Sequence, residues 1–201
     1  MTPVAPVAGV LLGALALLAG YLVGSLAASA RIGRLAGIDP AGIDVAAAGG
    51  PGGGPASVWR LAGPGWGFLA LTADLAKGVV PVAIGIVTFS WAMGWVAALG
   101  AVVGAGWPWF GRGARDRGLA TFAGAAFTLA PPAGLMGGMI ALAVLVIGRL
   151  VRRNAGRAAA ATGIGSYVVL ALLLEPDLAR PAALLVLSVV AVINLVTIRR
   201  R

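Results

Sequence analysis

The chain has 201 residues, of which 60% are hydrophobic and only 10% charged, and its mean hydropathy is +1.01. Soluble domains carry about 25% charged residues, so this composition excludes a soluble globular domain as well as a disordered chain. The lack of Cys and His excludes disulfides, thiolate nucleophiles, histidine bases and His/Cys metal sites.

Apolar runs bounded by charged clusters or by Pro and Gly predict about seven membrane-spanning helices. They lie at about residues 4–28, 66–89, 91–110, 118–131, 133–150, 158–174 and 182–198. The fourth run is short and ends at two prolines, so we expect it to be tilted or not fully spanning. Small residues let membrane helices approach closely, which makes Gly104, Gly106, Gly137 and Gly138 expected helix contacts. We predict an all-α polytopic integral membrane protein, with residues 1–201 as one transmembrane domain.

The basic residues predict the orientation of the chain. An outside N-terminus and an inside C-terminus place all but two of the 15 Lys and Arg residues in or beside inside segments, as the positive-inside rule requires. Polar motif loops then lie on the cytoplasmic side at about residues 31–65, 111–118 and 149–158. Much of the net charge of +9 is therefore explained by topology, and no nucleic-acid partner is expected.

The first inside segment contains the glycine-rich stretch GGPGGGP at 49–55, followed by Ser57 and Arg60. Consecutive glycines expose backbone N–H groups that can surround an oxyanion, and an arginine can bind phosphate with two hydrogen bonds. A merely flexible loop is the alternative. Gly49, Gly54, Ser57 and Arg60 are therefore candidates for an anion site.

Asp74 and Lys77 are three residues apart inside the second span. Ionisable residues in a span cost about 2.5–3.5 kcal/mol each on insertion scales, so they are paired or functional by default. One interpretation is a structural ion pair that satisfies itself. The other is that Asp74 holds the Lys77 ammonium toward an anionic ligand.

Two further inside segments combine arginines with helix starts. Arg112, Arg115 and Arg117 precede Gly118, where the unpaired amides and the helix dipole favour an anion, and Asn154 and Arg157 are three residues apart and can project together. The chemistry shared by all these clusters is phosphate binding. Such a site could move a phosphate ester, bind an anionic lipid headgroup, or catalyse transfer from a lipid-borne phosphate.

These clusters resemble the signature loops of the acyl-phosphate-dependent glycerol-3-phosphate acyltransferases, which are small bacterial membrane enzymes. The sequence has the family's Gly-Ser at the inner end of the first span and its D-x-x-K-G motif in the second. The matching residues are Gly24, Ser25, Gly49, Gly54, Arg60, Gly63, Asp74, Lys77, Gly78, Gly104, Trp107, Pro108, Phe110, Gly118, Ala120, Thr121, Asn154 and Arg157, with Arg117 in place of a family lysine. The departures are Gly50, Gly52, Ala56 and Ser57 in place of polar family residues, Arg115 and Asp116 in place of a glycine pair, and Ala105 and Val151 at two histidine positions.

The resemblance implies an enzyme that transfers a fatty acyl group from acyl phosphate to glycerol 3-phosphate, giving lysophosphatidate and phosphate. It implies catalytic roles for Lys77, Arg117 and Arg60. The substrate-binding residues that it implies are Ser25, Gly49, Gly54, Ser57, Asp74, Thr121, Asn154 and Arg157. The expected location is the bacterial inner membrane, with the site facing the cytoplasm, and no cofactor or metal is expected.

Two other functions stay open from the sequence. The departures from the family pattern are compatible with a catalytically inactive member that binds phospholipid or a partner enzyme. A small anion or phosphate-ester transporter is the second alternative, although transport predicts paired repeats with broken helices around a central site, and the sequence shows no such symmetry.

Overall fold

The computed structural model describes residues 4–38, 54–110, 118–151, 156–174 and 188–193. Every regular element within these ranges is helical, which confirms the all-α prediction, and residues 188–193 are helical as well. The helices are α1 (Val4–Gly24), α2 (Ala28–Leu35), α4 (Pro55–Ala62), α5 (Pro64–Thr88), α6 (Trp91–Gly106), α7 (Leu119–Leu129), α8 (Pro131–Leu150) and α9 (Gly156–Leu174).

Five of the predicted spans from 66 to 174 correspond to α5 through α9, and the span at 182–198 lies mostly outside the described residues. Among the described residues, three stretches are long and apolar enough to cross a membrane: Ala8–Leu35, Pro64–Thr88 and Pro131–Gly148. The helices α6 and α7 and the stretch Ala158–Leu174 of α9 are shorter but also apolar. The protein is therefore a helical membrane protein, while the exact number of spans and the orientation of its termini stay predictions.

The predicted end of the first span was wrong by about one turn. Helix α1 ends at Gly24, and α2 begins at Ala28 after a break in which Ala27 has φ −79° and ψ 64°. The segment 31–65, predicted as a loop, contains the rest of α2 and all of α4. Pro55 suits the first turn of α4 because its missing N–H is not needed there. Gly63, at φ 90°, separates α4 from α5.

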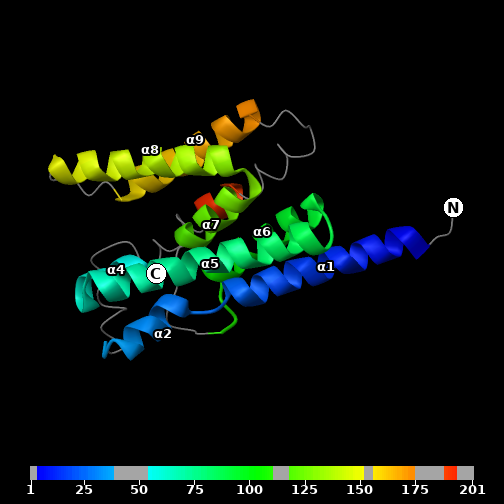
Figure 1. Ribbon diagram of the computed structural model, residues 1–201, viewed down its shortest axis with the longest axis horizontal. Coiled ribbons are helices and arrows are strands. Elements are labelled where there is room, and N and C mark those ends of the chain that lie inside the picture. The colour runs from blue at the N-terminus through cyan, green and yellow to red at the C-terminus, as the bar shows by residue number, and fades with distance from the viewer. Residues whose placement is uncertain (1–3, 39–53, 111–117, 152–155, 175–187, 194–201) are drawn as a thin grey trace.

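The helices form two groups joined by α7 (Figure 1). Helices α1, α5 and α6 pack side by side, and α8 pairs with α9. Helix α7 contacts both α5 and α8. The short helices α2 and α4 pack on α5 at the end of the molecule where α5 begins, far from the N-terminus (Figure 1). This arrangement brings α2, α5 and α7 together although they are far apart in the sequence.

Small residues allow the close packing of α1 on α6. A Cβ atom on Gly20 or Gly24 would lie within 2.2 Å of a backbone oxygen of α6, and a Cβ on Gly100 or Gly104 would lie 2.2 Å from a backbone oxygen of α1. Backbones this close use van der Waals contact and weak Cα–H···O bonds in place of large side chains. The expected contacts at Gly104 and Gly137 are confirmed, and Gly106 is buried. The expected contact at Gly138 is wrong, because nothing lies within 4 Å of a Cβ there.

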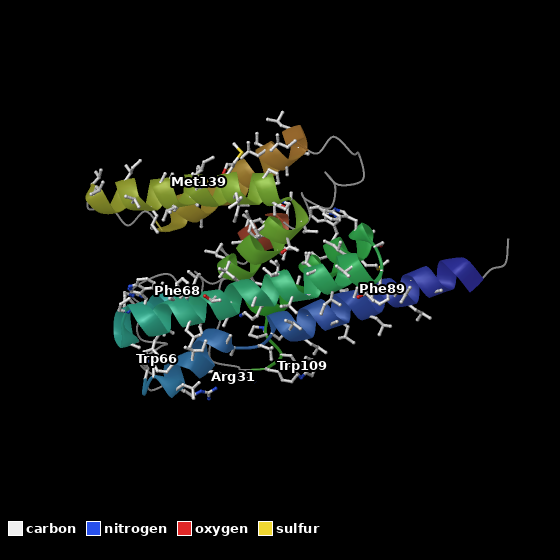
Figure 2. All side chains as sticks on the ribbon, viewed as in Figure 1. Arg31, Trp66, Phe68, Phe89, Trp109 and Met139 are labelled. Carbon is white, nitrogen blue, oxygen red and sulfur yellow. The ribbon has the colours of Figure 1, made fainter. Side chains whose placement is uncertain are left out.

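A buried apolar core connects the two helix groups. In it, the rings of Phe122 on α7 and Tyr167 on α9 meet edge to face, with centroids 5.6 Å apart. Outside the core, large apolar side chains such as Phe68 and Met139 point away from the bundle (Figure 2). Met139 is 69% exposed. An outer surface of this kind fits lipid hydrocarbon, as the composition predicts.

Candidate active site

Asp74 and Lys77 form an ion pair inside α5. The Lys77 Nζ lies 2.7 Å from Asp74 Oδ1, and the two residues are 5% and 0% exposed. Asp74 lies about 15 Å along the helix from Pro64, at 1.5 Å per residue. The pairing predicted from the spacing of three residues is confirmed. A pair this well buried needs further hydrogen bonds to offset the loss of water.

The second oxygen of the Asp74 carboxylate is bound by a residue that the sequence reasoning missed. Ser29, buried on α2, donates its hydroxyl to Asp74 Oδ2. The available signal was the pattern of α2, in which Arg31 and Arg34 occupy the exposed face while Ser29 and Gly33 occupy the buried face. If this segment had been interpreted as an amphipathic helix, Ser29 would have been predicted to face the interior of the bundle.

The break between α1 and α2 supplies a further partner for Lys77. Its Nζ donates to the Leu26 carbonyl oxygen at 3.1 Å, so the ammonium binds a carbonyl at the C-terminal end of α1. Next to it, the Ser25 hydroxyl donates to the Tyr21 carbonyl at 2.7 Å. The predicted residue Ser25 is therefore buried beside the ion pair, at the point where α1 stops.

Helix α7 contributes Thr121, whose hydroxyl donates to the Asp74 carbonyl oxygen at 3.3 Å. This approach depends on two glycines. A Cβ on Gly78 would lie 2.0 Å from the Thr121 carbonyl oxygen, and a Cβ on Gly124 would lie 2.2 Å from that of Leu75. The glycine of the D-x-x-K-G motif thus allows α7 to pack directly on the ion pair.

A small recess opens beside these groups. Its free volume is about 10 Å³, which is roughly the space that one water molecule occupies. Within the described part of the chain, the Lys77 ammonium is ion-paired with Asp74 at 2.7 Å and donates to the Leu26 carbonyl oxygen at 3.1 Å. The recess therefore combines the Lys77 ammonium and its carboxylate partner with two serine hydroxyl groups. Its lining includes Ser25, Ser29, Asp74, Lys77, Ala105 and Pro108.

Of the other predicted site residues, some are described but do not line this recess. The rest lie outside the described residues. Ser57 is buried and Arg60 exposed on α4, and Gly54 directly precedes that helix. None of these three is among the residues that surround the recess. The predicted site residues that lie outside the described ranges are Gly49, Arg117, Asn154 and the side chain of Arg157. The structure thus brings together Ser25, Asp74, Lys77 and Thr121 from the predicted set.

A second, apolar cavity of about 160 Å³ lies between α7, α8 and α9. Phe122 and Tyr167 form part of its wall, and glycines at 134, 137, 138 and 163 leave the space open. Phe122 directly follows Thr121 in α7. Thr121 donates to the Asp74 carbonyl oxygen, whereas Phe122 lines the apolar cavity, so adjacent residues connect the two sites.

An apolar helical bundle with a buried ion pair, hydroxyl groups and a broken first helix defines a polytopic membrane protein with a polar site inside it. The sequence model of the family "glycerol-3-phosphate acyltransferase" matches residues 14–201. The chain therefore belongs to the glycerol-3-phosphate acyltransferase family, and the resemblance found in its motifs is confirmed.

Curated relatives with the same family name support this assignment. The glycerol-3-phosphate acyltransferase of Rubrobacter xylanophilus is 40% identical over 134 residues, which are 66% of this chain and 63% of the relative. That of Pseudomonas syringae pv. tomato is 32% identical over 177 residues, 85% of this chain and 84% of the relative. The match spans slightly less than two thirds of the Rubrobacter protein's length.

Solved structures share the fold. A crystal structure of PlsY (YgiH), an integral membrane glycerol 3-phosphate acyltransferase in its lysophosphatidic acid form, superposes with a TM-score of 0.77. The sequence identity is 22%, and the match covers 94% of this chain and 90% of PlsY. The glycerol 3-phosphate form gives a TM-score of 0.76 at 21% identity, covering 90% of this chain and 87% of that one.

Proposed function

We propose that this protein transfers a fatty acyl group from acyl phosphate to the 1-hydroxyl of glycerol 3-phosphate, at the cytoplasmic face of a bacterial inner membrane. Family membership supports acyl transfer to glycerol 3-phosphate. The single observation that carries the proposal is Lys77, a buried cation that is held by Asp74 and Leu26 and lines the recess. A cation placed there suits substrates that both carry phosphate.

The reaction needs no covalent intermediate on the protein. The glycerol 3-phosphate hydroxyl oxygen attacks the acyl carbonyl carbon, the bond from that carbon to the phosphate oxygen breaks, and phosphate leaves. The hydroxyl proton goes to a phosphate oxygen. The protein contributes orientation of the two substrates and a positive charge near the oxygens that gain negative charge. Lys77, Arg60 and Arg117 are the proposed catalytic cations.

The remaining proposed site residues serve binding. Ser25, Thr121 and Asp74 fix the geometry around Lys77 through the hydrogen bonds described above. The phosphate groups are proposed to bind the backbone and polar side chains of the glycine-rich and arginine-rich segments. Those residues are Gly49, Gly54, Ser57, Asn154 and Arg157.

The apolar cavity between α7, α8 and α9 is the proposed place for the acyl chain of the donor. Its lining is almost entirely apolar, which suits a hydrocarbon chain and not a phosphate. Thr121 contacts the Asp74 network while Phe122 lines the cavity. A donor with its chain on the Phe122 side would therefore place its acyl phosphate toward the Lys77 side of α7.

The proposal is tested with the purified full chain in detergent, supplied with acyl phosphate and glycerol 3-phosphate. Released phosphate and lysophosphatidate are measured together, because hydrolysis alone would give phosphate without the lipid product. We expect both products from the parent protein, retention in Ser166→Ala and loss in Lys77→Met. Ser166 is a suitable control because, within the described ranges, its hydroxyl donates to carbonyls of its own helix and to no other group. Equal product from parent and Lys77→Met would contradict the proposal.

A further inference from the structure

Ser29 joins a helix outside the D-x-x-K-G motif to the ion pair within it. It is buried on α2, and its hydroxyl donates to Asp74 Oδ2, while Asp74 Oδ1 faces Lys77. The two carboxylate oxygens therefore have different partners from different helices. This division fixes the rotation of the carboxylate, which an ion pair alone would leave free to bind the ammonium through either oxygen.

The orientation of the carboxylate decides where the Lys77 ammonium lies. With Oδ2 held by Ser29, the Lys77 Nζ sits 2.7 Å from Oδ1 and also reaches the Leu26 carbonyl at 3.1 Å. Without the Ser29 hydroxyl, Oδ2 would be buried without a donor, which is costly for a charged group. The carboxylate would then turn both oxygens toward the ammonium and draw it from Leu26.

We infer that Ser29 is a positioning residue, whose hydroxyl orients Asp74 so that Lys77 presents its ammonium group to the recess. For its effect on turnover, the inference rests on the function proposed above. Ser29 is not proposed to touch a substrate, although it belongs to the wall of the recess. Ser29 acts through Asp74. Loss of its hydroxyl is expected to move the Lys77 ammonium while the fold is retained.

The sequence offers a spectroscopic test that needs no activity, because Lys77 is the only lysine in the chain. Protein grown with lysine labelled with ¹³C at Cε gives one lysine side-chain NMR signal. We expect Ser29→Ala to shift this signal, Ser29→Thr to keep it near the parent position, and Ser166→Ala to leave it unchanged. Ser29→Cys, which keeps the size but is a weak donor, should behave as Ser29→Ala if the alanine variant fails to fold.

Turnover provides the second measurement. Loss of a hydrogen bond to a charged group is worth about a factor of ten or more in rate. We expect Ser29→Ala to lower kcat for phosphate release about tenfold, with a change in KM for glycerol 3-phosphate of less than about twofold.

The outcomes separate this inference from the proposed function. A lysine signal in Ser29→Ala and Ser29→Cys that coincides with the parent signal would overturn the inference, whatever the activity. If the parent protein does not transfer acyl groups, the proposed function fails, while the NMR comparison still decides the role of Ser29.

Discussion

Tyr21 and Gly104 lie against each other where α1 crosses α6. A Cβ on Gly104 would lie 2.2 Å from the Tyr21 carbonyl oxygen. The Tyr21 hydroxyl donates to the Trp107 carbonyl at 2.9 Å, just beyond the end of α6. The same carbonyl of Tyr21 accepts the Ser25 hydroxyl. The packing of α1 on α6 and the break that forms the recess therefore share one residue.

Replacement of Gly104 by Ala is expected to destabilise the protein. The added methyl group would overlap backbone atoms of α1, and overpacking of this kind costs roughly 1–3 kcal/mol. The measurement is the thermal unfolding temperature in detergent, followed by Trp fluorescence. Gly138→Ala is the matched control, because its Cβ would meet nothing within 4 Å. An unfolding temperature for Gly104→Ala equal to that of the control would contradict the close contact.

Replacement of Asp74 and replacement of Lys77 are expected to lower the stability of the protein by different amounts. Asp74→Leu leaves the Lys77 ammonium buried without its carboxylate, whereas Lys77→Met leaves a carboxylate that still accepts from Ser29. Breaking a buried pair typically costs about 3–5 kcal/mol. We expect Asp74→Leu to unfold at the lower temperature.

The double variant Asp74→Leu/Lys77→Met provides the check on this reasoning. It removes both charges and replaces them with apolar groups, so stability should recover relative to Asp74→Leu. Phosphate release should stay absent in the double variant because the cation is gone. A double variant as unstable as Asp74→Leu would mean that the lost packing, and not the stranded charge, caused the defect.

Gly78→Ala is expected to impair activity by moving α7 away from α5. Its Cβ would lie 2.0 Å from the Thr121 carbonyl oxygen, so the two helices must separate and the bond from Thr121 to Asp74 must break. We expect phosphate release to fall about tenfold or more, by analogy with the loss of other positioning contacts. Gly165→Ala on α9, where a Cβ meets nothing within 4 Å, is the control. Full activity in Gly78→Ala would show that α7 is dispensable for turnover.

The predicted orientation is tested with single cysteines, because the natural chain has none. Cysteines at Gly52, Arg115 or Asn154 should resist membrane-impermeant thiol reagents in intact cells and react after permeabilisation. A cysteine at Ser90, in the predicted outside turn between α5 and α6, should react in intact cells. Labelling of Gly52→Cys or Arg115→Cys in intact cells would reverse the assignment of the cytoplasmic side.

The sequence predicted those features that depend on local pattern. Apolar runs located α1 and α5 to α9, and the spacing of three residues identified the pair of Asp74 and Lys77, because both signals act within one helix. Pro55 and Gly63 were also local signals for the bounds of α4, although the segment was read as a loop.

Features that depend on packing between helices could not be read in the same way. The break after Gly24 comprises Ser25, Leu26 and Ala27, and its mostly apolar composition continues the helical pattern. Ser29 binds a residue 45 positions away, a pairing that only the packing of α2 on α5 produces. The recess could therefore be identified only from the structure, although several of the residues that line it were already predicted as site residues.

The shortness of α7 has a consequence for the surrounding lipid. Its 11 residues span about 16 Å at 1.5 Å per residue, roughly half of the hydrocarbon thickness of a typical bilayer. Phe127 is 46% exposed on this helix, so lipid can reach that side. Hydrophobic mismatch there favours a locally thinned bilayer, with headgroups drawn toward the helix ends. In the proposed reaction, a phosphate-bearing substrate would thereby cross less hydrocarbon to reach Thr121, and thicker bilayers of longer-chain lipids would restore that barrier.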